Sequence, residues 1–213
     1  MGQSSRLAAA QLDTLAELAR LAQASAFYLA GGGAVALHFG HRQSRDLDLF
    51  TRGPAVDLEV LRRTLVTKGG VEVLAISDTT LAVRMGGVPV DFVNYPYSLL
   101  EEPLTGPAGI RYAGIKDLAV MKLVAIARRG FKRDFWDLHE LLVRGPMKLG
   151  RALSCYRQRF GVAEADTYHV LKALTYFADA ESEDAPLQGM KPAHWRAIKA
   201  FFEKQVREIM RFE

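Results

Sequence analysis

The spacing of hydrophobic positions changes near residue 114, and this change divides the chain into two halves. In the first half, short apolar runs typical of strands alternate with stretches of helical spacing. The strand-like runs are 26–30, 47–50, 71–77, 81–85 and 88–93, and the helix-like stretches are 7–21, 34–39 and 56–66. From residue 115 onward we expect only helices, over 115–128, 132–143, 147–159, 166–180 and 192–211. The pattern predicts an α/β domain over residues 1–113 and an all-helical domain over 114–213.

Turn-forming residues indicate how the last three strands connect. Asp78-Thr79-Thr80 and Gly86-Gly87 separate three β-rich runs, and both separators suit tight turns. We therefore expect an antiparallel meander. Two further segments are rich in loop-forming residues and are expected to be irregular: 95–109 and 180–189.

Composition excludes several classes of protein. The 213 residues are 49% hydrophobic and 24% charged, with a net charge of +4; this excess suits either a polyanionic partner or none. The single cysteine, Cys155, excludes an internal disulfide and a cysteine-based zinc cluster. The longest apolar run, 26–37, is too short to span a bilayer, and residues 1–23 do not resemble a signal peptide. We expect a cytoplasmic protein without a membrane partner.

An acidic pair is the first candidate for chemistry. Asp46 and Asp48 are two apart on an expected strand, so they share one face while Leu47 and Leu49 occupy the other. Two carboxylates at such spacing repel by about 2–4 kcal/mol, which a bound cation relieves. Oxygen ligands alone favour Mg²⁺ or Mn²⁺. The alternative is a pair of exposed aspartates at a strand end with ordinary partners.

Two other features lie at sequence positions that strengthen the metal hypothesis. Gly31-Gly32 follows a strand and opens a helix, where backbone amides can approach phosphate oxygens; the alternative is a tight turn without a ligand. Asp91 is the single charged residue of the apolar run 88–93, and it could complete a two-metal site. Its alternative is a salt bridge to Arg84 across the hairpin.

The helical half contributes one unusual lysine. Lys122 has four apolar neighbours on its helix, Leu118, Ala119, Ala125 and Ile126. A lysine in such a stripe either extends its ammonium to water or meets an anion. On the next helix Asp134 and Asp137 share a face, and we expect Asp137 to pair with Arg133 one turn earlier. Asp134 also suits a helix N-terminus.

Taken together, these motifs resemble the AbiEii/AbiGii toxin family of nucleotidyltransferases, within the polymerase-β-like superfamily. The resemblance covers roughly residues 27–142. Its first block is Leu29-Ala30-Gly31-Gly32-Gly33-Ala34 with Ser44 and Asp46-Leu47-Asp48-Leu49-Phe50, and its second is Lys122-Leu123 with Lys132-Arg133-Asp134-Phe135 and Asp137-Leu138. Gly33 departs from the pattern, because relatives usually carry Thr or Ser there.

The resemblance implies roles for individual residues. Gly31, Gly32, Asp46 and Asp48 would bind a nucleoside triphosphate and its metal ions, with Asp91 as a third carboxylate. Ser44 would orient the phosphates with help from Arg42, Lys122 would contact the phosphates, and Asp134 would be catalytic.

The resemblance also implies a fold and an activity. We expect an α/β nucleotidyltransferase core with a mixed sheet, an all-helical C-terminal half, and an active site between them. The expected reaction moves a nucleoside monophosphate from an NTP to RNA, at a tRNA 3′ end, with the protein as a toxin restrained by a cognate antitoxin. The basic cluster Arg128, Arg129, Lys132 and Arg133 would either guide RNA or form a solvated face.

Two other functions stay open on the sequence. The acceptor could be a small hydroxylated molecule or a protein side chain. A module that senses nucleotides and binds a partner without catalysis is the non-enzymatic alternative.

Overall fold

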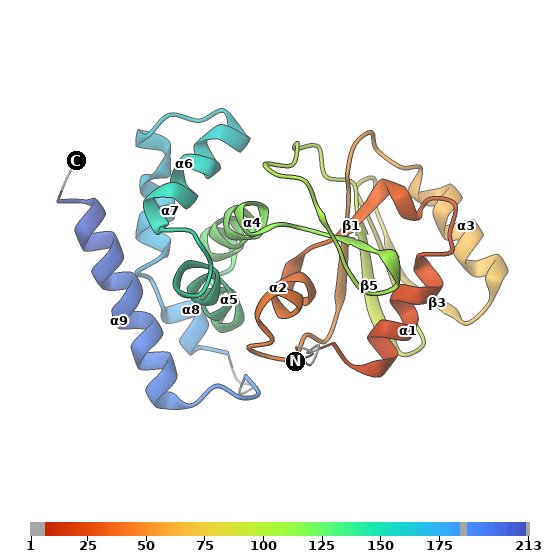
Figure 1. The fold of residues 1–213 in the computed structure, drawn as a ribbon, viewed down its shortest axis with the longest axis horizontal. Coiled ribbons are helices and arrows are strands. Elements are labelled where there is room, and N and C mark those ends of the chain that lie inside the picture. Colours follow the sequence, from red (N-terminus) through yellow and green to blue (C-terminus); the bar gives the residue numbers. More distant parts are fainter. Residues whose placement is uncertain (1–6, 184–186, 212–213) are drawn as a thin grey trace. The chain divides into compact units, whose positions relative to one another are not determined.

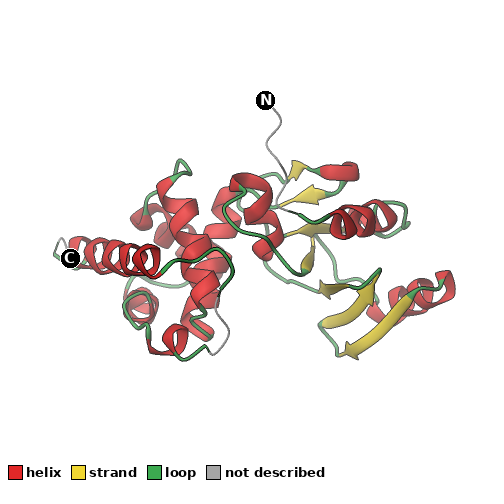
Figure 2. Cartoon of the chain, turned by 90° about the horizontal axis from the view of Figure 1, so that it is seen from below, coloured by secondary structure: helices red, strands yellow, loops and turns green. Residues whose placement is uncertain are grey.

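The computed structural model describes residues 7–183 and 187–211. The chain forms two compact units, Met1–Gly114 and Ile115–Glu213 (Figure 1). Figure 2 shows the strands in the first unit, whereas the described part of the second unit contains helices and loops. The predicted α/β core with a mixed sheet, followed by a helical half, is therefore confirmed. That each unit is a separate functional domain stays a prediction.

The first unit is built on a seven-stranded mixed sheet with the order β3-β4-β5-β2-β1-β7-β6. The strands are β1 Phe27–Leu29, β2 Leu47–Thr51, β3 Val71–Ile76, β4 Thr80–Met85, β5 Val88–Val93, β6 Leu104–Thr105 and β7 Arg111–Tyr112. The predicted meander is confirmed, since β3, β4 and β5 pair antiparallel. β5 then pairs parallel with β2, and β2 pairs antiparallel with β1.

Strand β6 lies in the segment 95–109 that we expected to be irregular, and β7 lies just after it. These strands have two residues each, and β7 pairs with β1 through Leu29 and Tyr112. A two-residue strand has too few side chains to show a period. Such strands are recognised only through the neighbour with which they pair.

One face of the sheet carries the apolar core of the first unit. The helices of this unit are α1 Ala9–Leu18, α2 Gly31–Phe39 and α3 Leu58–Lys68. Leu18 of α1, Leu61 of α3, Leu49 of β2 and Phe92 of β5 line one small apolar space, so α1 and α3 cover the same sheet face. Side chains two residues apart on a strand share a face. The aspartates of β2 and β5 consequently lie on the opposite face from this core.

The edge strand β3 exposes apolar side chains. Val73, Leu74 and Ile76 are each at least 36% exposed, and the register with β4 shifts between Val73 and Ala75. Such an irregularity twists an edge strand and disfavours further strand pairing.

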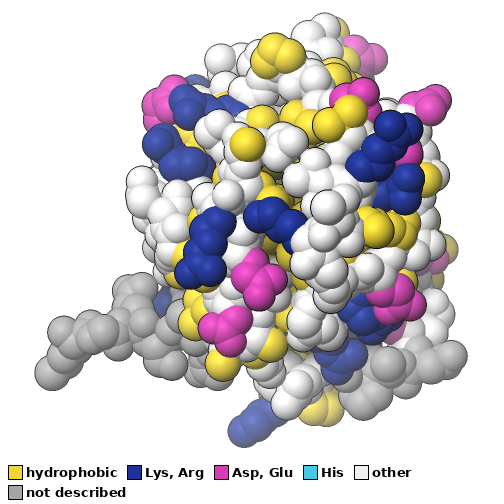
Figure 3. Space-filling view, turned by 90° about the vertical axis from the view of Figure 1, so that its right-hand side faces the viewer, with side chains coloured by type: hydrophobic (Ala, Val, Ile, Leu, Met, Phe, Trp, Pro, Cys, Tyr) yellow, Lys and Arg dark blue, Asp and Glu magenta, His cyan; other side chains and the backbone are white. Residues whose placement is uncertain are grey.

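On the side of the molecule where α3 lies, Figure 3 shows apolar side chains scattered among lysine, arginine and acidic ones.

The second unit packs its described helices around an aromatic core. They are α4 Ile115–Arg128, α5 Lys132–Val143, α6 Leu149–Phe160, α7 Tyr168–Ala173, α8 Ala178–Glu181 and α9 Pro192–Ile209. The ring of Phe135 lies 5.3–5.8 Å from those of Phe177, Trp195 and Phe202. No helix in the described ranges is long and apolar enough to cross a bilayer.

The single helix expected over 166–180 is wrong. The segment contains a 3-10 turn, Ala165–Thr167, then α7, then a break before α8. At the break Phe177 has φ −106° and ψ 0° and packs against Phe135 and Trp195. The segment contains no Gly or Pro that would mark this break in the sequence, so the local pattern could not predict it.

Candidate active site

Strand β2 positions the acidic pair as its period requires. Asp46 directly precedes the strand and Asp48 lies within it; both are half-buried, while Leu47 and Leu49 are buried. The buried leucines anchor the strand in the core. Both carboxylates therefore project from the opposite face of the sheet.

Asp91 lies beside this pair. It is the register partner of Asp48 in the parallel pair β2–β5. Burial, and then the negative charge of Asp46, raise the pKa of Asp91. Arg84, the alternative partner for Asp91, instead forms an ion pair with Glu72 at 3.1 Å. The three carboxylates thus gather on one sheet face, where Asp46 and Asp91 repel each other.

The glycine turn lies against the same carboxylates. Gly31 has φ +56°, and a Cβ atom there would collide with the carboxylate of Asp48. A Cβ atom at Gly32 would collide with the guanidinium of Arg42. The amide of Ala30 donates to the backbone oxygen of Asp48 at 2.8 Å, which fixes the turn to β2. Glycine is required at Gly31 because of its positive φ and its approach to Asp48, whereas a side chain at Gly32 would displace the Arg42 guanidinium from the turn.

Gly33 has a different environment. A Cβ atom there would lie 3.6 Å from the backbone oxygen of Asp46 and from the Leu29 side chain, which is ordinary contact. The position therefore has room for a small side chain. Steric contacts therefore do not require glycine at Gly33.

Ser44 and Arg42 are both buried beside the acidic pair. The hydroxyl of Ser44 lies 3.1 Å from Oδ1 and 3.2 Å from the backbone oxygen of Asp46, to which it can donate. Arg42 donates through Nη1 to the backbone oxygen of Gln43 at 3.1 Å. Ser44 thus holds a carboxylate, and the expected contact of Ser44 with phosphates stays a prediction.

The donor set of this face fits a divalent cation. Asp46, Asp48 and Asp91 offer only carboxylate oxygens, which Mg²⁺ and Mn²⁺ prefer. Burial and the charge of Asp46 raise the pKa of Asp91, so a cation at this face would favour the ionised form of Asp91. The N-terminus of α2 adds backbone amides and the positive end of a helix dipole. Such a face can hold a metal ion together with a phosphate.

The second unit holds the other predicted site residues in one buried cluster. The ammonium of Lys122 lies 2.9 Å from Oδ1 of Asp134 and 2.7 Å from Oδ2 of Asp137. Nε of Arg129 lies 2.9 Å from Oδ2 of Asp134. Both aspartates have fully buried side chains, whereas that of Arg129 is 47% exposed. The buried ammonium of Lys122 therefore meets two anions, the carboxylates of Asp134 and Asp137.

The expected pairing of Asp137 with Arg133 is wrong. Asp137 faces the interior and binds Lys122. A buried ammonium costs more to leave unpaired than a surface arginine, so Lys122 takes both carboxylates. The signal was present in the sequence, since Asp134 and Asp137 share a helix face. From the sequence we predicted no role for Asp137 at the site, although it binds Lys122 together with Asp134.

Electrostatics make Asp134 a poor proton acceptor. Burial raises its pKa, but the charges and hydrogen bonds of Lys122 and Arg129 outweigh burial and hold the pKa below its usual value. A carboxylate that is a weak base with cations on both oxygens suits positioning better than proton transfer.

Comparisons with known proteins identify the family and the fold. The model of the family described as "Nucleotidyl transferase AbiEii toxin, Type IV TA system" matches residues 13–85 and 79–211. An uncharacterized protein of Aquifex aeolicus, aq_aa25, is 34% identical over 202 residues, which cover 94% of this chain and 96% of that protein.

Solved structures share the fold at low identity. MenT4, a nucleotidyltransferase toxin from Mycobacterium tuberculosis, has a TM-score of 0.54 at 17% identity, covering 92% of this chain and 83% of its own. A putative nucleotidyltransferase from H. pylori has a TM-score of 0.52 at 15% identity, covering 95% and 96%.

Proposed function

Because the chain belongs to the AbiEii family of nucleotidyltransferase toxins, we propose that this nucleotidyltransferase moves a nucleoside monophosphate from an NTP to the 3′ end of a tRNA and releases pyrophosphate. One observation carries the proposal. Asp48 and Asp91 are register partners on neighbouring parallel strands, with Asp46 on the same face and the Gly31 turn against Asp48. Membership of an enzyme family sets the non-enzymatic alternative aside.

Asp46, Asp48 and Asp91 would hold Mg²⁺ or Mn²⁺ at this face. A divalent ion supplies neutralisation of the phosphate charge during an in-line displacement. Ser44 keeps the carboxylate of Asp46 in place through its hydroxyl. The protein thereby holds its ligands in one arrangement before the nucleotide arrives.

The glycine turn would hold the triphosphate. Gly31 and Gly32 have no side chains, so phosphate oxygens can approach the backbone amides at the N-terminus of α2. Arg42 is buried against Gly32 and adds a positive charge to the same turn. Amides, helix dipole and guanidinium all favour an anion at this point.

The bond changes follow from this placement. The acceptor hydroxyl oxygen forms a bond to the α-phosphorus, and the bond from that phosphorus to the oxygen bridging to the β-phosphate breaks. Pyrophosphate leaves with the electron pair of the broken bond. We assign the hydroxyl proton to Asp91, which lies beside Asp48, because the low pKa of Asp134 makes Asp134 a weak acceptor. Lys122 as a phosphate contact and Asp134 as a catalytic residue stay predictions from the family resemblance.

An RNA acceptor and an antitoxin complete the proposal. The chain has a net charge of +4, and Arg128, Arg129, Lys132 and Arg133 begin or precede α5. Arg129 and Arg133 both place their guanidinium about 5 Å from the Phe131 ring. These guanidinium groups lie against the ring, so the positive charge of the cluster, and not the ring, is what suits a polyanionic RNA. The family description as a type IV toxin supports a cognate antitoxin.

A labelling experiment tests the acceptor. The protein is incubated with each α-labelled NTP, Mg²⁺, total tRNA and a pool of small hydroxylated molecules. We expect label in the tRNA fraction. Digestion of this tRNA with a 3′ exonuclease should release the label. Label in the small-molecule or protein fraction alone would contradict the RNA acceptor but keep the nucleotidyltransferase, whereas no transfer with any nucleotide would contradict both.

A further inference from the structure

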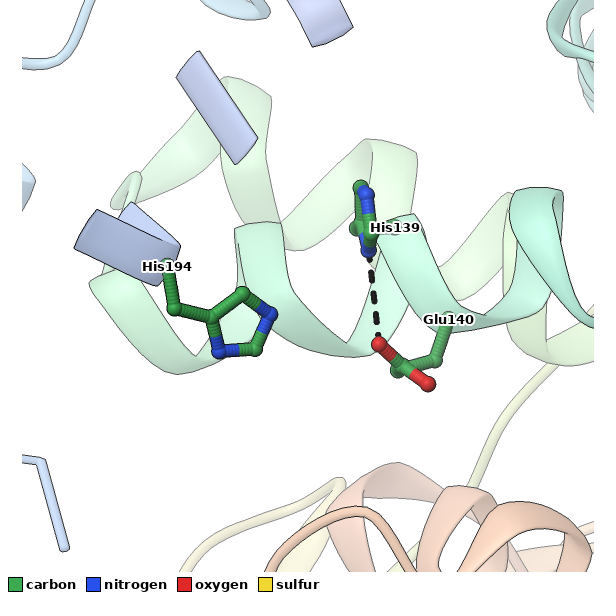
Figure 4. A group of neighbouring side chains, drawn as sticks. All are labelled: His139, Glu140 and His194. Carbon is green, nitrogen blue, oxygen red and sulfur yellow. Dashed lines mark hydrogen bonds and ion pairs between the residues drawn. The ribbon is translucent and has the colours of Figure 1, made fainter. Parts of the chain in front are cut away.

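A second group of metal-ligating side chains lies in the helical unit. His139 and Glu140 come from α5 and His194 from the first turn of α9 (Figure 4). Each offers a ligand atom, and these atoms lie within 4.8 Å of one another. His194 and His139 are half-buried, and Glu140 is 8% exposed. Partial burial gives such a group a route to solvent together with a fixed arrangement.

The spacing suits one small ion. Nδ1 of His139 lies 3.3 Å from Oε1 of Glu140. Ligands at 2.0–2.2 Å from a tetrahedral zinc ion are separated by about 3.3–3.5 Å. Two of the three ligands are thus already at the spacing of a single coordination sphere. The ligand atom of His194 lies within 4.8 Å of the other two, so a reorientation of the His194 ring would bring it into the same coordination sphere.

Neighbouring groups orient all three ligands. The His139 ring meets the Phe201 ring edge-on at 4.9 Å, and the His194 ring meets that of Trp136 at 5.0 Å. Arg144 donates to Oε2 of Glu140 at 3.2 Å, which turns Oε1 toward His139. Groups that hold a ligand in this way raise metal affinity because less side-chain freedom is lost on binding.

The donor types select the metal. Two imidazoles and one carboxylate form a set that zinc takes in proteins, with a fourth position for water. Nitrogen donors favour Zn²⁺ over Mg²⁺, whose ligands are oxygens. The all-carboxylate face of the first unit has the opposite preference. The two sites therefore differ in ligand chemistry.

We propose that His139, Glu140 and His194 form a zinc site that joins α9 to α5. This site is separate from the proposed transfer reaction and does not depend on it. A bound zinc ion would link His139 and Glu140 of α5 to His194 in the first turn of α9. The attachment of residues 192–209 then depends on metal, and so does the stability of the helical unit.

Cobalt substitution tests the site in the full chain. Protein freed of metal with EDTA is titrated with Co²⁺ in excess Mg²⁺, which occupies carboxylate-only sites. We expect one equivalent of Co²⁺ to give the visible absorption of a low-coordinate nitrogen site, and Zn²⁺ to displace it. His194→Ala and Glu140→Gln should lose the band. The matched control His169→Ala, at an exposed histidine of α7, should keep it.

Thermal unfolding gives a measurement on the unaltered protein. Zinc at about 100 times its Kd should raise Tm by about 5–10 °C, and EDTA should reverse the rise. Hydrogen exchange should slow in α9 when zinc is present. Absence of a cobalt band in the wild-type protein, or an equal band in His194→Ala, would overturn the proposal. A zinc-induced rise in Tm that His194→Ala and Glu140→Gln both retain would overturn it too.

Discussion

Asp48 of β2 lies directly opposite Asp91 of β5 in the parallel strand pair β2–β5. This pair joins the meander β3-β4-β5 to the other strands of the sheet. The two residues are 43 positions apart in the sequence, and neither is fully buried. Their pairing brings a third carboxylate to the acidic pair Asp46 and Asp48 at the start of β2. Like charges at this spacing destabilise the protein unless a cation is present.

The first prediction concerns the charge of Asp91. Its pKa is raised by burial and by Asp46, so its stabilising contribution is present at low pH and is lost as the pH rises through that pKa. Asp91→Asn should therefore raise the free energy of unfolding of the metal-free protein at pH 7 by an amount on the order of 1 kcal/mol. The Tm of the metal-free protein should rise with it. Mg²⁺ should raise the Tm of the wild type more than that of the variant. A metal-free variant that melts below the wild type would contradict this account of repulsion.

The second prediction compares two glycines of the same turn. Gly31→Ala puts an alanine at φ +56° and against the carboxylate of Asp48, so it should cost about 1–2 kcal/mol and abolish NTP binding. Gly33→Ala is the matched control, because its Cβ has ordinary contacts, and it should stabilise α2 by about 0.5–1 kcal/mol. Chemical denaturation and calorimetry measure both effects. Equal behaviour of the two variants would refute the role of the close approach at Gly31.

The third prediction concerns the hydroxyl of Ser44. Ser44→Ala removes its contact with Asp46, so we expect kcat to fall about tenfold and the free energy of unfolding to fall by about 1.5–3 kcal/mol, the contribution of one hydrogen bond to a charged group. The control is Ser98→Ala, at an exposed position of the first unit. Steady-state kinetics with varied Mg²⁺ checks the prediction. Unchanged kinetics would mean that Asp46 needs no such support.

The fourth prediction concerns the buried cluster of the second unit. Lys122→Met leaves Asp134 and Asp137 buried without their shared ammonium, so the free energy of unfolding should fall by about 3–5 kcal/mol. Urea denaturation at pH 7 measures it. Arg62→Met, at a partly exposed cation that pairs with Glu59, is the matched control and should leave the midpoint unchanged. A midpoint shift no larger than the control's would show that the cluster does not hold the helices together.

The same cluster should respond to acid. Since the pKa of Asp134 is lowered overall by Lys122 and Arg129, its stabilisation is present above the usual carboxyl pKa and is lost as the pH falls through the folded-state value. Asp134→Asn should flatten this loss between about pH 5 and pH 2. An identical acid profile in the variant would exclude Asp134 as a source of the acid sensitivity.

The sequence alone was sufficient for the acidic face but not for its neighbours. Strand period placed Asp46 and Asp48 together because that geometry is local. The register between Asp48 and Asp91 depends on a parallel pairing between distant strands, which no local pattern encodes. Likewise, the apolar stripe around Lys122 required an anion, but only helix packing decides that Asp137 supplies it together with Asp134.

The most direct test of the central claim is the rate of NMP transfer by Asp48→Asn. Pyrophosphate release is measured with the preferred NTP, Mg²⁺ and tRNA, beside Asp78→Asn, which changes an exposed aspartate of the same unit. The carboxylate face predicts a loss of at least about a hundredfold for Asp48→Asn and no change for Asp78→Asn, with both variants folded. Transfer by Asp48→Asn at the wild-type rate would contradict the claim that this face is the catalytic centre.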